Sequence, residues 1–272
     1  TAKILWIIYF SFTIIQTILL KLAGMSWYDA LAHTLSTLGT GGFSTKNSSI
    51  AYYNSPAIEW ICTVFMFLAS INFSLYYYAV TFKFKEIIQN SEFKAFIFIV
   101  FATALGITFF IYNVYNNFGH SFREALFQTT SIISTTGFSS VNFDLWPAGA
   151  KIFLLLLMLI GGCSGSTAGG VKVIRWVVLS KQTTNEVRKM LHPHGVFNVQ
   201  LNGRVGRKDV VFSVAGFLFL YCFIVAITAL VAACNNIDTM SSITASMAMV
   251  GNVGPGLGAV GPMYNFGFFS PA

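Results

Sequence analysis

Long apolar stretches alternate with short polar segments along the whole chain. A helix needs about 20 apolar residues to cross a hydrocarbon core of roughly 30 Å, and the pattern predicts four uninterrupted spans and one broken span. They cover residues 4–23, 57–80, 95–115, 148–179 and 211–233, and the broken one is 148–179, where GGCSGSTAGG follows KIFLLLLMLI. The predicted fold class is an all-α polytopic membrane protein.

Composition and charge agree with a membrane setting. Hydrophobic residues make up 55% and charged residues 9% of the chain, whereas an ordinary soluble domain has about 25% charged residues. Most Lys and Arg residues lie between spans two and three, or between the glycine-rich interruption and span five, which the positive-inside rule assigns to the cytoplasm. The net charge of +7 then reflects topology, and no nucleic-acid partner is needed to explain it. Residues 24–56, 116–147 and 234–272 are assigned to the opposite side.

A short run of Gly, Thr and Ser, LSTLGTGGFST at 35–45, overlaps the end of a helix-compatible segment at 27–38. Both ends of this connection lie on the outer side, so a helix of about 18 Å would reach halfway into the bilayer and return as extended chain. Non-helical backbone at that depth is tolerated only inside protein or beside a watery cavity. A re-entrant loop is therefore predicted.

The same arrangement recurs along the chain. A shift of 95 positions places DAL (29–31) on EAL (124–126) and GFS (42–44) on GFS (137–139), and a further shift of 117 places NVG (252–254) on TTG (135–137). Each copy consists of a span, a half-helix, a Gly-bearing loop and a second span. The predicted pore repeats are residues 1–85, 93–190 and 209–272, and the third stops before its second span.

Recurring loops of this composition favour a cation pore. A narrow filter replaces the water shell of an ion with backbone carbonyls, and Gly permits the positive φ angles that turn such carbonyls inward. The half-helices would end near Leu38, Ile133 and Val250, where their negative ends favour a cation. For any one loop, an ordinary flexible turn is an equally good interpretation. The recurrence of the Gly-bearing loop in matching topological positions favours the filter interpretation.

The motifs resemble the TrkH/KtrB superfamily of bacterial potassium-uptake proteins, and its TrkH branch most closely. The resemblance rests on TLGTGGFST (37–45), TTGFSSVNFD (135–144), MLIGGCSGSTAGGVKVIR (158–175) and VGNVGPGLG (250–258). Members carry four span–loop–span repeats around one pore, so this chain is expected to hold the equivalents of repeats two, three and part of four. Without the first repeat and the last span, it is not expected to close a filter alone.

The resemblance also implies site residues. The K⁺ filter would be lined by Gly39, Thr40, Gly41, Gly42, Ser134, Thr135, Thr136, Gly137, Gly251, Asn252, Val253 and Gly254. The intramembrane gate would consist of Gly161, Gly162, Ser164, Gly165, Ser166, Thr167, Gly169 and Gly170, and a kinked structural helix is the alternative. Gate coupling is one interpretation of Lys172 and Arg175, and positive-inside anchoring is the other. Because Asn252 and Val253 depart from the Thr-rich pattern, we expect an asymmetric and less K⁺-exclusive filter.

The resemblance further implies K⁺ as the transported ion, with Na⁺ as a second ion that could pass, and no cofactor, catalytic residue or other metal site. The implied setting is a multi-pass homodimer among the lipids of the bacterial cytoplasmic (inner) membrane, with a cytosolic nucleotide-binding ring as its regulatory partner. The turn dipeptide Asn202-Gly203 predicts a cytoplasmic hairpin that could serve as a docking surface. An ion-coupled carrier and a membrane-embedded enzyme remain as alternatives. Parallel repeats disfavour the first, and the absence of a catalytic constellation disfavours the second.

Overall fold

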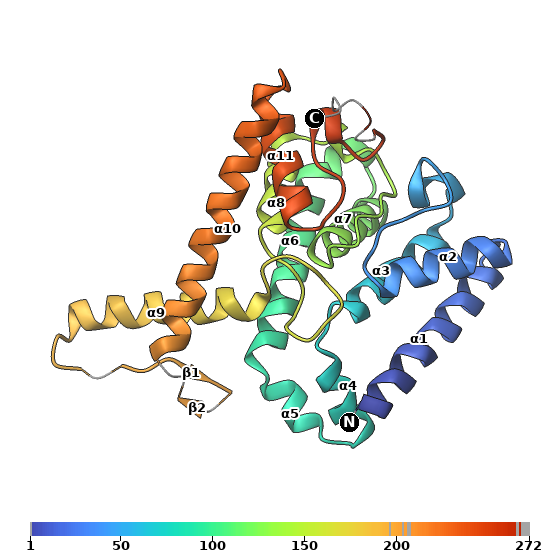
Figure 1. Ribbon diagram of the computed structural model, residues 1–272. Coiled ribbons are helices and arrows are strands. Elements are labelled where there is room, and N and C mark those ends of the chain that lie inside the picture. The colour runs from blue at the N-terminus through green and yellow to red at the C-terminus, as the bar shows by residue number, and fades with distance from the viewer. Residues whose placement is uncertain (1, 196, 203, 206–207, 265–266, 268–272) are drawn as a thin grey trace.

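Two long apolar helices lie on opposite sides of the molecule, and a third runs through its middle beside a buried half-helix (Figure 1). The computed structural model describes residues 2–195, 197–202, 204–205, 208–264 and 267. Within these residues, the helices long and apolar enough to cross a membrane are α1 (Ala2–Leu22), α6 (Ser91–Tyr115) and α10 (Lys208–Cys234). Trp6, Phe98 and Phe219 are among the large apolar side chains that these helices leave exposed, as contact with lipid requires.

Three shorter helices, α2 (Trp27–Leu38), α7 (Phe118–Ile133) and α11 (Thr239–Val250), form the half-helices. Each begins at a side-chain cap that satisfies a free N–H of the first turn. Ser26 accepts from the Asp29 N–H, Asn117 from the His120 N–H, and Asp238 from the Ser241 N–H. The predicted half-helix at 27–38 therefore coincides with α2.

The predicted span at 57–80 is wrong as one continuous helix. It consists of α3 (Pro56–Ala69) and α4 (Phe73–Val80), which meet at an angle of 93°. Asn72 starts α4 by accepting a hydrogen bond from the Ser74 N–H at 2.8 Å. The backbone groups freed by the break bond to a distant segment, because the Cys163 N–H donates to Ser70 O at 2.9 Å and the Phe73 N–H donates to Gly165 O at 3.1 Å.

The broken span at 148–179 divides into α8 (Ala148–Met158), a non-helical segment at 159–172, and α9 (Val173–Leu191). We call residues 159–172 the glycine-rich loop. Helix α9 runs crosswise to α10 in Figure 1 and becomes polar after its first turns. In the described part of the chain it is not among the helices long and apolar enough to cross a membrane alone.

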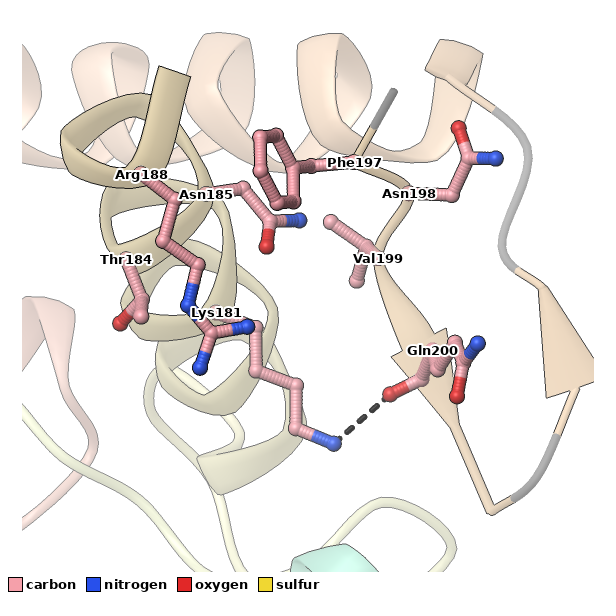
Figure 2. Close-up of a pocket in the computed structure, with 8 residues that line it drawn as sticks. All are labelled: Lys181, Thr184, Asn185, Arg188, Phe197, Asn198, Val199 and Gln200. Atoms are coloured by element: carbon pink, nitrogen blue, oxygen red, sulfur yellow. Dashed lines mark hydrogen bonds between the residues drawn. The ribbon is translucent and has the colours of Figure 1, made fainter. Parts of the chain in front are cut away.

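The predicted hairpin is present, although Gly203 of its turn dipeptide lies outside the described residues. Strands β1 (Gln200–Leu201) and β2 (Arg204–Val205) pair antiparallel, on the same side of the molecule as the short helix α5 (Phe84–Gln89) (Figure 1). Figure 2 shows a pocket of about 460 Å³ between α9 and the segment leading into β1, where the Lys181 ammonium donates to Gln200 O at 2.7 Å. The hairpin is thereby attached to α9.

Short 3₁₀ turns lie on the outer connections, at η1 (Ser49–Tyr53), η2 (Phe143–Leu145) and η3 (Gly258–Val260). The largest apolar core packs α6, α7 and α8 together, with Phe96, Ile107 and Leu154 fully buried. Helix α7 is buried from Glu124 to Ile133. This packing fixes the C-terminal end of α7 near the middle of the molecule.

Candidate functional site

The half-helices α2, α7 and α11 end in the same backbone cap. The residue after each C-cap has a left-handed φ angle, 49° at Thr40, 56° at Thr135 and 57° at Asn252. The following N–H reaches back to the carbonyl five residues earlier, from Gly41 to Ser36 at 2.7 Å, from Thr136 to Ser131 at 3.0 Å and from Val253 to Ala248 at 2.7 Å. These bonds define a Schellman cap, which usually has Gly at the left-handed position. A Thr there costs about 1–2 kcal/mol, so two threonines in the left-handed region suggest a functional constraint.

A glycine with positive φ stands two residues further on in each loop, at Gly42 (70°), Gly137 (82°) and Gly254 (104°). At two of these positions the neighbouring loop leaves no room for a side chain. A Cβ on Gly42 would lie 1.9 Å from Thr136 O, and a Cβ on Gly137 would lie 2.2 Å from Val253 O. The first loop therefore contacts the second, and the second contacts the third, each time through a glycine of one loop and a carbonyl oxygen of the next. This is the arrangement expected of neighbours in a ring.

All three glycines line one pocket of about 390 Å³ on the outer side of the loops. Lys46 also lines it, although a fixed positive charge would repel a cation. The Lys46 ammonium lies 3.9 Å from the Asp29 carboxylate and 4.9 Å from the centre of the Tyr52 ring. These two neighbours offset part of its charge.

The start of each half-helix is tied to the returning loop. The Thr45 hydroxyl donates to Asp29 at 2.6 Å, and the Ser140 hydroxyl donates to Glu124 at 2.5 Å. Ser140 and Glu124 lie 95 positions after Thr45 and Asp29, so the two hydrogen bonds are equivalent in the two copies. In the third copy the Ala259 N–H donates to the Ser241 hydroxyl at 2.8 Å. The bond from Thr45 lowers the pKa of Asp29. These hydrogen bonds fix the position of each returning loop relative to the start of its half-helix.

A buried charge cluster joins α3 to α7. The Arg123 guanidinium lies 2.6 Å from Glu59 and 3.3 Å from Glu124, and both carboxylates are almost fully buried. His120 lies 3.3 Å from Glu124. Removing one partner of such a cluster would leave an uncompensated buried charge, so Arg123 is expected to hold α7 to α3.

The glycine-rich loop lies against the inner ends of all three half-helices. The Thr40 hydroxyl donates to Thr167 O at 2.9 Å, and the Gly169 N–H donates to the Thr135 hydroxyl at 2.6 Å. A Cβ on Gly169 would lie 3.1 Å from Asn252 Cβ and 3.2 Å from Gly251 O. The side chains of Thr40 and Thr135 thus bond to this loop, and Asn252 Cβ lies beside it.

Three sets of contacts hold the loop in place. Its flanks pair with each other, since the Gly161 N–H donates to Val171 O at 2.7 Å and the Val173 N–H to Gly162 O at 3.1 Å. The break between α3 and α4 binds its middle, as described above. The carboxylate of Glu92, on α6, accepts from the loop's Ser164 N–H at 2.5 Å. The sequence gave no sign of a role for Glu92, because this residue belongs to no motif and stands beside Lys94 at the start of span three.

The two basic residues after the loop have different contacts. The Lys172 ammonium donates to Ala168 O within the glycine-rich loop. The Arg175 guanidinium instead stacks over the Phe217 ring of α10, 3.6 Å from its centre. Of the two residues predicted to couple the gate, Lys172 contacts the loop directly and Arg175 contacts α10.

The site offers backbone carbonyls and hydroxyls rather than a metal-binding cluster. Within the described residues, no group of three or more His, Cys, Asp or Glu side chains could hold a metal ion. Carbonyl and hydroxyl oxygens, together with three helix C-termini carrying about half a negative charge each, suit a monovalent cation.

Comparisons with known proteins agree on one family. The family model described as "TrkH: Cation transport protein" matches residues 1–270. The Trk system potassium uptake protein TrkH of Vibrio parahaemolyticus is 38% identical over 266 residues, covering 96% of this chain and 55% of that protein. The TrkH protein of Escherichia coli strain K12 is 34% identical over 263 residues, with coverages of 96% and 54%.

A solved structure is similar over nearly the whole chain. The crystal structure of the potassium transporter TrkH from Vibrio parahaemolyticus matches with a TM-score of 0.89 and 38% identity, over 95% of this chain and 56% of that one. The chain therefore spans about half the length of the curated relatives it matches.

Proposed function

We propose that this chain, which belongs to the TrkH family of cation transport proteins, forms most of the wall of a K⁺ uptake pathway. Its curated relatives are named as potassium uptake proteins. The observation that carries the proposal is the contact of three identically capped loops, with Gly42 against Thr136 O and Gly137 against Val253 O. Such a ring segment can present carbonyls to a dehydrated ion.

The filter in this proposal consists of the twelve residues from Gly39 to Gly42, from Ser134 to Gly137 and from Gly251 to Gly254. This assignment is supported by a pattern of φ angles that recurs in all three loops. In each loop, two residues with left-handed φ angles flank one residue that is not left-handed. Three of the repeats that surround it would be residues 1–85, 93–190 and 209–272. A further repeat elsewhere in the full-length protein would close the ring, which agrees with relatives of about twice this length.

The glycine-rich loop is proposed as the gate. It contacts the side chains of Thr40 and Thr135 from the side opposite the outer pocket, so an ion leaving the filter would meet it. Glycine-rich backbone at this position can change conformation at low steric cost. Opening would require the hydrogen bonds from Thr40 and to Thr135 to break.

Regulation and assembly follow the family resemblance. We propose a homodimer in the bacterial cytoplasmic membrane, controlled by a cytosolic nucleotide-binding ring. The hairpin β1–β2 and the polar part of α9 form a basic cytoplasmic surface on which such a ring could dock, with Lys181 and Arg188 among its residues (Figure 2).

Ion flux in proteoliposomes tests the proposal. The full-length protein is reconstituted, and K⁺ and Na⁺ uptake are measured separately, with Gly42→Ser beside the wild type. We expect saturable K⁺ flux that exceeds Na⁺ flux, and a lower K⁺ preference in the variant. Absence of flux of both ions from a folded protein would reject a passive pore and would favour a coupled carrier.

A further inference from the structure

The first turn of α6 is capped without any help from Glu92. The Asn90 side chain accepts from the Phe93 N–H at 2.9 Å, and the Asn202 side chain accepts from the Ser91 N–H at 2.8 Å. An acid in a first turn is often explained by the helix dipole alone. That explanation leaves Glu92 exposed, whereas only 4% of its surface is accessible.

Glu92 instead binds another part of the molecule. Its Oε1 atom accepts from the Ser164 N–H at 2.5 Å and from the Ile174 N–H at 3.2 Å. Ser164 lies in the glycine-rich loop, and Ile174 lies in the first turn of α9, just after it. One carboxylate oxygen thus joins the middle of the loop to the start of α9, beside the backbone pairs of Gly161 with Val171 and of Gly162 with Val173.

A buried carboxylate needs such partners, because desolvation penalises the charge unless hydrogen bonds or opposite charges offset it. Lys172 lies near enough to attract the Glu92 carboxylate, and its ammonium is bonded to Ala168 O of the same loop. Glu92 and Lys172 therefore both hold the loop from its cytoplasmic side.

The residue next to Glu92 contacts the cytoplasmic hairpin. Asn202, at the turn between β1 and β2, accepts from the Ser91 N–H. The strand preceding the turn is bonded to α9 through Lys181 and Gln200 (Figure 2). Ser91 and Glu92 thus connect the hairpin to the glycine-rich loop through two consecutive residues.

We propose that Glu92 is a positioning residue that holds the glycine-rich loop closed beneath the filter, and that Asn202 connects this clamp to the cytoplasmic hairpin. The proposal rests on the gating role proposed above for that loop. In the clamped state the loop contacts Thr40 and Thr135. Release of the Ser164 N–H and the Ile174 N–H from Glu92 lets the loop leave the filter. Movement of the hairpin weakens the clamp by removing the Asn202 cap from α6.

Two substitutions at Glu92 separate the acceptor from the size of the side chain. Glu92→Gln keeps Oε1 and can accept both N–H groups, whereas Glu92→Met keeps the volume and removes the acceptor. Glu86→Met is the matched control, because Glu86 is an exposed acid on the neighbouring helix α5. All three are made in the full-length protein.

Two readouts are compared, namely basal K⁺ flux in proteoliposomes and hydrogen–deuterium exchange of residues 161–174. In Glu92→Met we expect both the flux and the exchange to rise by about tenfold or more, since two hydrogen bonds to a charged group are lost. Glu92→Gln and Glu86→Met should stay within about twofold of the wild type. A Glu92→Met protein with wild-type flux and exchange would overturn the proposal, and so would equal changes in the Gln and Met variants.

Exchange also separates the clamp from the transport role. If the wild type carries no K⁺ flux, the proposed function fails, while faster exchange in Glu92→Met still establishes the clamp. Asn202→Ala tests the connection with a surface variant that leaves the core intact. It should raise flux and loop exchange in the same direction as Glu92→Met, and it should add nothing to Glu92→Met in the double variant. Fully additive effects would overturn the connection.

Discussion

Gly137→Ser tests the filter because the structure gives two separate reasons for a large effect. Gly137 has φ of 82°, which costs about 1–2 kcal/mol for an L-residue. A Cβ there would lie 2.2 Å from Val253 O, and real Cβ contacts do not fall below 3.0 Å, so one loop must move by about 0.8 Å. Overpacking of this kind adds about 1–3 kcal/mol, for a total of about 2–5 kcal/mol.

The displaced atom is a proposed ion ligand, so the strain acts on selectivity. A carbonyl oxygen displaced by about 0.8 Å no longer replaces the hydration shell of the ion with the same geometry. We expect the ratio of K⁺ to Na⁺ flux in proteoliposomes to fall by about tenfold or more, which corresponds to about 1.4 kcal/mol. The melting temperature should fall while the protein remains folded.

Gly24→Ser is the matched control. Gly24 has φ of 108°, but a Cβ at this position would have no neighbouring atom within 4 Å, and the residue lies between α1 and α2, away from the loops. It carries the backbone strain without the collision, so its flux ratio should match that of the wild type. A folded Gly137→Ser protein with an unchanged ratio would refute the filter assignment.

Three further predictions concern the supports of the filter. Thr135→Val removes the acceptor of the Gly169 N–H and should raise basal K⁺ flux by about twofold to tenfold; Thr129→Val, whose hydroxyl has no hydrogen-bond partner among the described residues, should not change it. Arg123→Met leaves Glu59 uncompensated and removes one of several partners of Glu124, so it should cost about 3–5 kcal/mol in thermal unfolding, with part of the loss recovered in the Glu59→Gln background. The hydrogen bond from Thr45 lowers the pKa of Asp29 in the folded protein. Ionised Asp29 therefore stabilises the fold at pH values above its unfolded-state pKa of about 3.9, and this stabilisation is lost as the pH falls through the lower folded-state pKa. The melting temperature of Asp29→Asn should therefore change less between neutral and acid pH than that of the wild type. An equal change in both proteins would contradict the stabilising role of ionised Asp29.

The features that depend on local sequence were predicted correctly. The half-helix at 27–38 begins after the capping residue Ser26, and the hairpin forms at Asn202, whose φ of 50° suits its turn. The family was inferred from four short motifs, and the match over residues 1–270 confirms it. Each of these patterns depends on neighbours in the chain or on recurrence along it.

The features that depend on distant partners were missed. Hydropathy predicts one helix at 57–80 because the break at Ser70 becomes favourable only when Cys163 and Gly165 supply its hydrogen bonds. Glu92 carries no motif, since its role arises from contact with residues 72 and 82 positions later. The third repeat aligns weakly in sequence, yet its cap at Asn252 has the same φ as that at Thr135 within a degree or so. Backbone geometry preserves the repeat better than side-chain identity does.

The position of Asn252 indicates that the sequence difference between the loops affects the proposed gate before it affects ion selectivity. Two of the residues at this place bond to the glycine-rich loop through their side chains, Thr40 as donor and Thr135 as acceptor, whereas Asn252 only has its Cβ beside Gly169. Asn tolerates the left-handed region better than Thr, because its short polar side chain can bond locally. The replacement of Thr by Asn thus relieves backbone strain in one loop and removes one hydroxyl from the surface that faces the proposed gate. The backbone that would face the ion has the same pair of positive φ angles in all three loops, so this difference bears on how the proposed gate is held before it bears on which ion is selected.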